Sequence, residues 1–340
     1  MKNGRGTVPF FVAVMLLLAL LSCRQAEKEP AAEVSNIRIT ELQRLDSAIS
    51  QDPSNAMLLN ERARYYLMSG EMNKALSDVN SALQIDSKNA AHYITLSDIY
   101  LSMGKLNNCI ESLEKAEELE PENTEGLLKQ AEVYLILREY QKTFEYVKRA
   151  LEIDDFNPVA YFIRGYALLE TGDTVKAVRE FIRATDQDQQ YYEAYMQLGL
   201  LYASKNDPLA VGYYRNAINS NPNNPEPYYF LGMFYQDNED IGKALQVYDQ
   251  LLAIDPEYVD AYYNLGYLNL VYLEDYEMAA RYFTDVIDRS PKHTDAWYNR
   301  GYAYELAGDY DMARMNYTRA LEITPNYELA VEALNRIDLK

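Results

Sequence analysis

Tyrosines and carboxylates are the side chains that this sequence offers in quantity for chemistry. Of its 340 residues, 32 are Tyr and 52 are Asp or Glu, against 32 Lys and Arg, two His and two Cys. Tyrosine presents a flat apolar ring with a hydroxyl group, and a carboxylate attracts cations and accepts hydrogen bonds. Together they predict a surface for a cationic or hydroxyl-rich ligand. Nucleic acid is excluded as a partner because a net charge of −20 repels phosphate.

No catalytic or metal-binding motif accompanies these residues. The sequence contains no G-x-S-x-G, no Walker loop, no H-E-x-x-H and no C-x-x-C. His92 and His293 are far apart in the chain, and Cys109 is one of two cysteines, too few for a four-cysteine zinc site. We therefore expect no enzyme activity, no metal and no cofactor.

The first 22 residues are predicted to be a signal peptide. A short basic segment precedes an apolar run from Val8 to Leu21, which is too short to cross a bilayer as a helix. The run ends in Leu20-Leu21-Ser22-Cys23, which resembles the bacterial lipobox. That resemblance implies a lipid on Cys23 and membrane contact through this lipid alone. An ordinary secretory signal with an incidental Cys23 is the alternative.

The same resemblance implies a place in the bacterial cell envelope. Arg24, and not Asp, follows Cys23, which favours an outer-membrane lipoprotein. Whether the protein faces the periplasm or the outside stays open. Residues 23–36 are polar and rich in Pro, Ala and Glu, which predicts a flexible tether.

The elements that must position the tyrosines follow from an internal repeat. A small residue recurs at steps of 33 to 35 residues, and the last unit carries the fullest pattern. The recurring small residues are Ala63, Ser97, Ala131, Gly165, Gly199, Gly232, Gly266 and Gly301. The last unit contains Trp297, Gly301, Tyr304, Gly308, Asp309, Tyr310, Ala313, Tyr317, Ala320 and Pro325. This pattern resembles the tetratricopeptide repeat.

The resemblance implies an all-α chain that forms a right-handed α-solenoid of about eight stacked helix hairpins over residues 56–327. Within each unit, apolar residues at i, i+3, i+4 and i+7 independently indicate helices. One hairpin cannot bury its apolar face alone, so neighbouring hairpins must stack. Residues 37–55 and 328–340 are predicted to be capping helices at the two ends.

Repeat position divides the tyrosines into two classes. Many occupy positions where the family has bulky packing residues. Others lie on the opposite face of the first helix of each hairpin, which in the family lines a concave ligand groove, although partial burial against neighbours is the alternative. The predicted groove comprises the aromatic and Met residues Phe162, Tyr166, Tyr229, Met233, Tyr263, Tyr267, Tyr298 and Tyr302 and the acids Glu193, Glu226, Asp260 and Asp295.

The leading functional prediction is a non-enzymatic, lipid-anchored scaffold that binds a protein or peptide segment in a bacterial envelope complex through this groove. The groove acids favour a cationic segment. The Lys, Arg and Asn clamp with which the best-known family members hold a C-terminal carboxylate is absent from these positions. Carbohydrate binding, to peptidoglycan or an exported glycan, is the alternative, and self-assembly is a third possibility.

Overall fold

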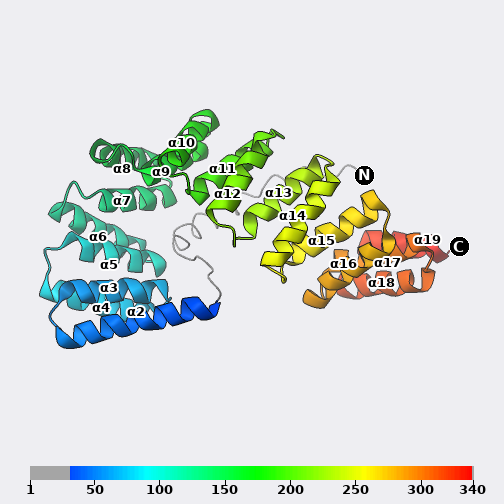
Figure 1. The fold of residues 1–340 in the computed structure, drawn as a ribbon, viewed down its shortest axis with the longest axis horizontal. Coiled ribbons are helices and arrows are strands. Elements are labelled where there is room, and N and C mark those ends of the chain that lie inside the picture. Colours follow the sequence, from blue (N-terminus) through cyan, green and yellow to red (C-terminus); the bar gives the residue numbers. More distant parts are fainter. Residues whose placement is uncertain (1–30, 339–340) are drawn as a thin grey trace. The chain divides into compact units, whose positions relative to one another are not determined.

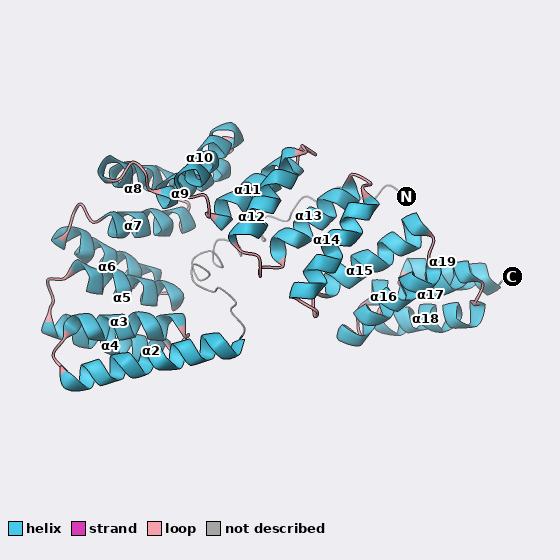
Figure 2. Cartoon of the chain, viewed as in Figure 1, coloured by secondary structure: helices cyan, strands magenta, loops and turns pink. Residues whose placement is uncertain are grey.

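The computed structural model describes residues 31–338, and their side chains from residue 41 onward. The predicted signal peptide, Cys23 and the start of the predicted tether lie outside this range. Every regular element within it is helical, which confirms the all-α prediction (Figures 1 and 2). None of these helices is long and apolar enough to cross a membrane.

Eight helix hairpins follow one another along the described chain, as the repeat predicts. The first four are α3 (Ala56–Met68) with α4 (Met72–Ile85), α5 (Ala90–Ser102) with α6 (Leu106–Leu119), α7 (Thr124–Ile136) with α8 (Tyr140–Ile153), and α9 (Pro158–Glu170) with α10 (Thr174–Gln187). The last four are α11 (Tyr192–Ala203) with α12 (Leu209–Ser220), α13 (Glu226–Asp237) with α14 (Ile241–Ile254), α15 (Val259–Leu268) with α16 (Tyr276–Arg289), and α17 (Thr294–Ala307) with α18 (Tyr310–Ile323).

The chain divides into two compact units between Ala194 and Tyr195, inside α11. We call the part up to Ala194 unit 1 and the part from Tyr195 unit 2. Within each unit, the two helices of a hairpin pack together and successive hairpins stack. Stacked hairpins form one layered array per unit, which is the solenoid construction predicted from the repeat.

The helix that precedes the hairpins is longer than the sequence predicts. α2 spans Ala31–Gln51 and packs on α3. Residues 31–36 were predicted to belong to the tether, and the structure corrects this. The physical reason is their composition, because Ala31, Ala32 and Glu33 are good helix formers that directly follow Pro30. At the other end, α19 (Glu328–Asp338) buries Ala333 and Ile337 against α18.

Close packing inside each hairpin explains the recurring small residue. An ideal Cβ on Gly232 would lie 2.5 Å from Cε1 of Tyr248, and one on Gly165 would lie 2.8 Å from Cε1 of Phe181. Only glycine leaves room for these buried rings. The same relation recurs in three further hairpins, between Gly199 and Tyr214, Gly266 and Phe283, and Gly301 and Tyr317.

Earlier hairpins in unit 1 achieve the same packing with a different pair of sizes. Ala63 packs with Val79 in the first hairpin, 16 positions later in the chain. Sixteen positions also separate Ala131 from Val147, and both are buried. A larger residue on the first helix thus accompanies a smaller one on the second. This exchange of volume places Tyr214, Tyr248 and Tyr317 in the core of unit 2, where none is more than 1% exposed.

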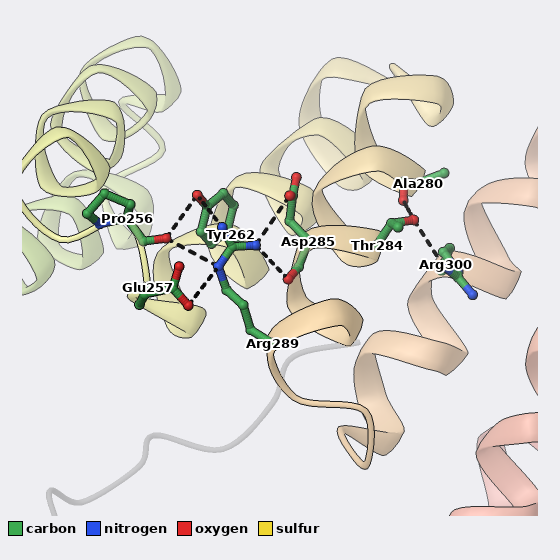
Figure 3. Close-up of polar contacts among 8 residues, drawn as sticks. All are labelled: Pro256, Glu257, Tyr262, Ala280, Thr284, Asp285, Arg289 and Arg300. Atoms are coloured by element: carbon green, nitrogen blue, oxygen red, sulfur yellow. Dashed lines mark hydrogen bonds and ion pairs between the residues drawn. The ribbon is translucent and has the colours of Figure 1, made fainter.

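Polar contacts join neighbouring helices of unit 2, both within a hairpin and between successive hairpins (Figure 3). Arg289 of α16 donates from Nε to the carbonyl of Pro256 at 3.2 Å and from Nη2 to the hydroxyl of Tyr262 at 3.1 Å. Arg300 of α17 donates to Oγ1 of Thr284 on α16 at 3.0 Å. The bonds to Pro256 and Thr284 connect successive hairpins and so fix their stacking register, whereas the bond to Tyr262 joins α15 and α16 within one hairpin.

The one-residue insertion of the seventh hairpin is absorbed by a π-helix. The segment η1 (Asn269–Leu273) continues α15, and Glu274 then adopts a left-handed backbone with φ of 53°. Inserting one residue into a helix produces such a π-turn. As a result the turn carries three exposed apolar side chains, those of Val271, Tyr272 and Leu273.

Candidate functional site

The predicted groove residues lie on the first helices of the hairpins and are divided between the two units. Phe162, Tyr166 and Glu193 belong to unit 1, on α9 and at the start of α11. The other nine belong to α13, α15 and α17 of unit 2. We call these nine the first-helix face of unit 2: Tyr229, Met233, Tyr263, Tyr267, Tyr298, Tyr302, Glu226, Asp260 and Asp295.

Each of three tyrosines on this face packs against an aromatic ring just before the next first helix. The ring centroids of Tyr229 and Tyr258 lie 5.4 Å apart. The ring of Tyr263 stacks on His293 at 5.1 Å and 21°. Tyr298 repeats the relation with Tyr327 at 5.7 Å. These distances are those of favourable aromatic pairs, so the rings bridge successive hairpins.

The residue before the first helix is a capping asparagine in the first four hairpins and an aromatic residue before most of the later first helices and before α19. Asn123 caps α7 by accepting a hydrogen bond from the amide of Gly126 at 3.0 Å. His293 performs both tasks, since its Nδ1 accepts from the amide of Ala296 at 3.2 Å while its ring stacks on Tyr263. The capping asparagines of unit 1 are Asn55, Asn89, Asn123 and Asn157.

The sequence prediction missed these aromatic partners. The signal that identifies them is an aromatic residue in place of the capping asparagine at the same point of the repeat. Four positions carry this signal: Tyr191, Tyr258, His293 and Tyr327. The prediction considered only residues on one face of the first helix. It therefore overlooked these aromatic residues, which lie in the loop before the helix.

Hydrogen bonds hold in place one ring of the face, that of Tyr263, and the ring of Tyr327, which packs on the face. The side-chain amide of Asn299 donates to the hydroxyl of Tyr263 at 2.9 Å. The hydroxyl of Tyr327 donates to Oδ1 of Asp295 at 2.6 Å. Burial raises the pKa of Tyr263 to about 12, and the negative charge of Asp295 adds to the shift. The phenols therefore stay neutral at physiological pH and act as hydrogen-bonding groups.

The C-terminal end of the face is closed by α19. The side chain of Glu305 accepts hydrogen bonds from Arg336 at 2.8 and 2.7 Å and from the hydroxyl of Tyr317 at 2.7 Å. Glu305 is 6% exposed, so its charge is compensated inside the array. Arg336 also lies 5.9 Å from the ring centroid of Tyr302. Arg336, the cation that α19 contributes here, is thus already paired with Glu305.

The accessible part of the face is a set of half-buried rings beside exposed carboxylates. All five tyrosines of the face and Met233 are half-buried. Asp260 and Asp295 are exposed, and Glu226 is half-buried. Burial raises the pKa of Tyr229, and the negative charge of Asp260 adds to the shift. Partial burial, the alternative to an open aromatic groove, therefore describes these tyrosines.

In unit 1, the structure buries Tyr166, which the sequence predicts to line an open groove. This side chain is 3% exposed, and burial raises its pKa to about 12. Phe162 is half-buried and packs on Tyr166, Phe181 and Tyr191 at 5.9, 5.6 and 5.4 Å. Tyr166 packs on Phe162 and Phe181, and Tyr191 at the start of the next hairpin covers Phe162 in turn. Glu193 is half-buried in the first turn of α11.

Charged side chains, which the prediction did not include, connect the first helices of unit 1. Nζ of Lys129 on α7 lies 3.0 Å from Asp98 on α5 and 3.5 Å from Glu132. Arg64 on α3 reaches Glu125 on α7 at 3.4 Å. The cations are matched by acids on the same helix or on other hairpins of unit 1, so this network serves the stacking of the unit.

Other reactive groups of the described chain are unsuited to catalysis. Cys109 is 1% exposed, and burial raises the pKa of its thiol to about 12, which keeps it protonated and unreactive. His92 is fully buried, and burial lowers its pKa. Within residues 31–338, no three His, Cys, Asp or Glu side chains cluster to hold a metal ion. The arrangement supports binding.

Comparison with family models identifies repeats of one kind along most of the hairpin region. Models of the tetratricopeptide repeat match residues 162–225, 268–328 and 92–123, and a model described as TPR repeat matches 234–271. Together these matches cover more than half of the chain. None of the curated proteins compared with the chain gives a significant match.

One solved structure shows the same fold, and two others are similar at lower TM-scores. The C-terminal part of a TPR repeat-containing protein from Cytophaga hutchinsonii aligns with a TM-score of 0.61 at 20% identity, over 70% of this chain and 98% of that one. A tetratricopeptide repeat protein from Parabacteroides merdae aligns with a TM-score of 0.46 at 18% identity, over 74% and 99%. The Cut9–Hcn1 structure of the APC/C aligns with a TM-score of 0.48 at 17% identity, over 97% and 63%.

Proposed function

We propose, on the premise that this chain belongs to the tetratricopeptide-repeat family, that it is a non-enzymatic scaffold that binds a cationic protein or peptide segment on the first-helix face of unit 2. Members of this family serve in protein–protein interaction. The observation that carries the finer proposal is the combination on this face of half-buried tyrosine rings with the exposed carboxylates of Asp260 and Asp295. Lysine and arginine side chains are attracted both to such rings and to such acids.

The first test reverses one charge on the face. Asp260 and Asp311 are both exposed and both lie in the first turn of a helix, but Asp311 is on α18, a second helix. In cells, a photo-crosslinking residue at Met233 should capture the partner. Asp260→Lys should lower the yield about tenfold, as expected for a close charge pair, whereas Asp311→Lys should not. Equal yields from the two variants would contradict the proposed face.

Carbohydrate is the second candidate ligand for the same face. Aromatic rings stack on sugar rings, and carboxylates accept hydrogen bonds from sugar hydroxyls, which fits the tyrosines and acids described above. The discriminating experiment is sedimentation of the purified protein with peptidoglycan. Co-sedimentation that is lost with Tyr302→Ala would favour the glycan, and no co-sedimentation would remove this candidate.

We further propose that the chain is anchored by a lipid on Cys23 in a bacterial envelope complex, at the outer membrane. This proposal rests on the lipobox-like Leu20-Leu21-Ser22-Cys23 and on Arg24. Metabolic labelling with an alkyne fatty acid should tag the wild-type protein and leave Cys23→Ala untagged. Fractionation of the labelled cells should then recover the tagged protein with the outer membrane, and recovery in a soluble fraction would refute the anchor.

A further inference from the structure

A cleft of unit 2 lies apart from the first-helix face. It has a volume of about 550 Å³ and is lined by residues of α12, α13 and α14. Figure 1 shows where these three helices lie in the chain. Its floor consists of Tyr228, Leu231 and Tyr235 of α13, which are between 2% and 9% exposed. A rigid, mainly apolar floor with accessible walls is a common form of binding site.

Two cations converge on one side chain of this floor. Nη2 of Arg215 on α12 donates to the hydroxyl of Tyr235 at 3.2 Å. Nζ of Lys243 on α14 lies 5.3 Å from the centroid of the same ring. Asp240, 2.5 Å from Lys243, raises the pKa of that ammonium group, while the nearby positive charge of Arg215 acts in the opposite direction. Two like charges are therefore held toward each other across the cleft.

The residues that line the cleft include no carboxylate. The polar groups of its walls, apart from the two cations, are the amides of Asn219, Gln246 and Gln250. Arg289 gives the contrast: it is surrounded by Pro256 carbonyl oxygen, Asp285 and Glu257 (Figure 3). Within the described part of the chain, Arg215 donates to a neutral hydroxyl and meets no acid within ion-pair distance. Lys243 is paired with Asp240 at the edge of the cleft, but Arg215 has no acidic partner among the described residues, so the cleft keeps an excess of positive charge. In a chain of net charge −20, such a cleft is suited to a ligand that brings its own negative charge.

We propose that this cleft binds an acidic peptide segment of a partner protein. An Asp or Glu side chain of the segment lies between Arg215 and Lys243, where two charge-assisted hydrogen bonds hold it. The wall amides pair with the peptide backbone, which offers both donors and acceptors. Toward the other end the cleft is lined by Ile218, Val247 and Ile254, which accept an aliphatic neighbour of the acidic residue. This apolar end favours a peptide over an acidic sugar.

This site has the opposite preference to the first-helix face, where acids favour a cation. The two proposals therefore stand or fall separately. Asp260→Lys on α15 serves as the variant that disables the first-helix face while leaving the cleft intact. A peptide that binds in the cleft keeps its affinity for this variant.

The test uses a phage-displayed library of random octapeptides selected on the full chain, with enriched peptides measured by fluorescence anisotropy. The double variant Arg215→Gln/Lys243→Gln removes both charges and retains side-chain amides. Lys176→Gln is the matched control, because Lys176 pairs with Asp173 at the start of α10 as Lys243 pairs with Asp240 at the start of α14. Equal helical circular dichroism of all variants shows that they fold.

The expected result is a set of peptides with an acidic residue beside an aliphatic one, whose affinity falls about tenfold or more in the double variant and stays unchanged in the control. Selection of peptides that do not distinguish the double variant from the wild type would overturn the proposal. Peptides that lose affinity in the double variant but contain no Asp or Glu would also overturn the proposal. Charge-dependent binding of an oligogalacturonate, with no peptide bound, would likewise overturn it and assign the cleft to an acidic glycan.

Discussion

At the scale of single residues, one position per repeat decides whether a first helix is capped or a neighbouring ring is covered. Asparagine at this position satisfies a free backbone amide, as Asn157 does for Val159 and Ala160 at 3.1 and 3.2 Å. An aromatic residue there covers the first-helix tyrosine of the previous hairpin instead. Tyr258 and Tyr327 cover such a tyrosine, and His293 both caps its helix and covers a tyrosine.

His293→Asn tests this division of roles. The asparagine preserves the cap of α17 and removes the ring that stacks on Tyr263. We expect a loss of about 0.5–1.5 kcal/mol in the free energy of unfolding, measured in urea, which is the range for an aromatic pair. His293→Ala removes the cap as well and should lose about 1 kcal/mol more. If His293→Asn is as stable as the wild type, the stack contributes nothing.

His92 gives unit 1 a dependence on pH. Its ring is fully buried, neither nitrogen has a hydrogen-bond partner among the described residues, and burial lowers its pKa from 6.5. The unfolded chain therefore binds the proton first as pH falls. The stability that neutral burial provides is complete above pH 6.5 and is lost below it, toward the lower folded pKa.

The variant that isolates this effect is His92→Leu. Denaturant unfolding of the two proteins at pH 7.5, 6.5 and 5.5 should show a decline for the wild type that is smaller for His92→Leu. Parallel declines would mean that other groups carry the whole pH dependence.

At the scale of elements, the hairpin is defined by complementary volumes on its two helices. Glycine on the first helix accompanies a ring on the second, as with Gly232 and Tyr248, whereas Ala63 accompanies Val79. The buried rings also engage the next hairpin, since Asn264 of α15 donates to the hydroxyl of Tyr248 at 3.0 Å. Three of the tyrosines of this sequence, Tyr214, Tyr248 and Tyr317, thus follow from how its later hairpins fill their cores.

Gly232→Ala should destabilise unit 2 by about 1–3 kcal/mol, the cost of overpacking a core, because the added Cβ overlaps a fully buried ring. Gly242→Ala on α14 is the matched control. A Cβ there meets no atom within 4 Å, so the change should be neutral or stabilising by up to about 1 kcal/mol. Urea unfolding measures both variants.

A second substitution tests whether Gly232 and Tyr248 share the same space. Adding Tyr248→Leu to Gly232→Ala recreates the pair of sizes found at Ser97 and the buried Leu113. The double variant should lose less stability than the sum of its single changes. Strict additivity would show that the two positions do not share space.

At the scale of the whole molecule, stacked hairpins contact their neighbours along the chain, so coupling is short-ranged within each unit. An ideal Cβ on Gly301 would lie 2.9 Å from Tyr317, so Gly301→Ala strains the last hairpin. We expect faster amide hydrogen exchange in α17, α18 and α19 and unchanged protection in α3 to α6. A uniform loss of protection along the chain would mean that the two units unfold as one.

The hairpins could be predicted from sequence because each follows from local spacing. Helical periodicity, a small residue at steps of 33 to 35 positions and the turns between helices are all properties of neighbouring residues. The site was only partly predictable. The repeat position places Tyr263 and Tyr298 on the first-helix face, but the same reasoning also places Tyr166 there, which the structure buries.

The sequence by itself determined the helical class, the eight hairpins and the set of tyrosines on the first helices. The tertiary structure decided which of those tyrosines a ligand can reach. Exposure depends on what the next hairpin places over each ring, as Tyr191 does over Phe162 and His293 over Tyr263. The tertiary structure also brings Arg215 and Lys243, from separate helices, to the same residue, Tyr235. Periodicity fixes the face on which a side chain lies, whereas packing between hairpins fixes what covers it.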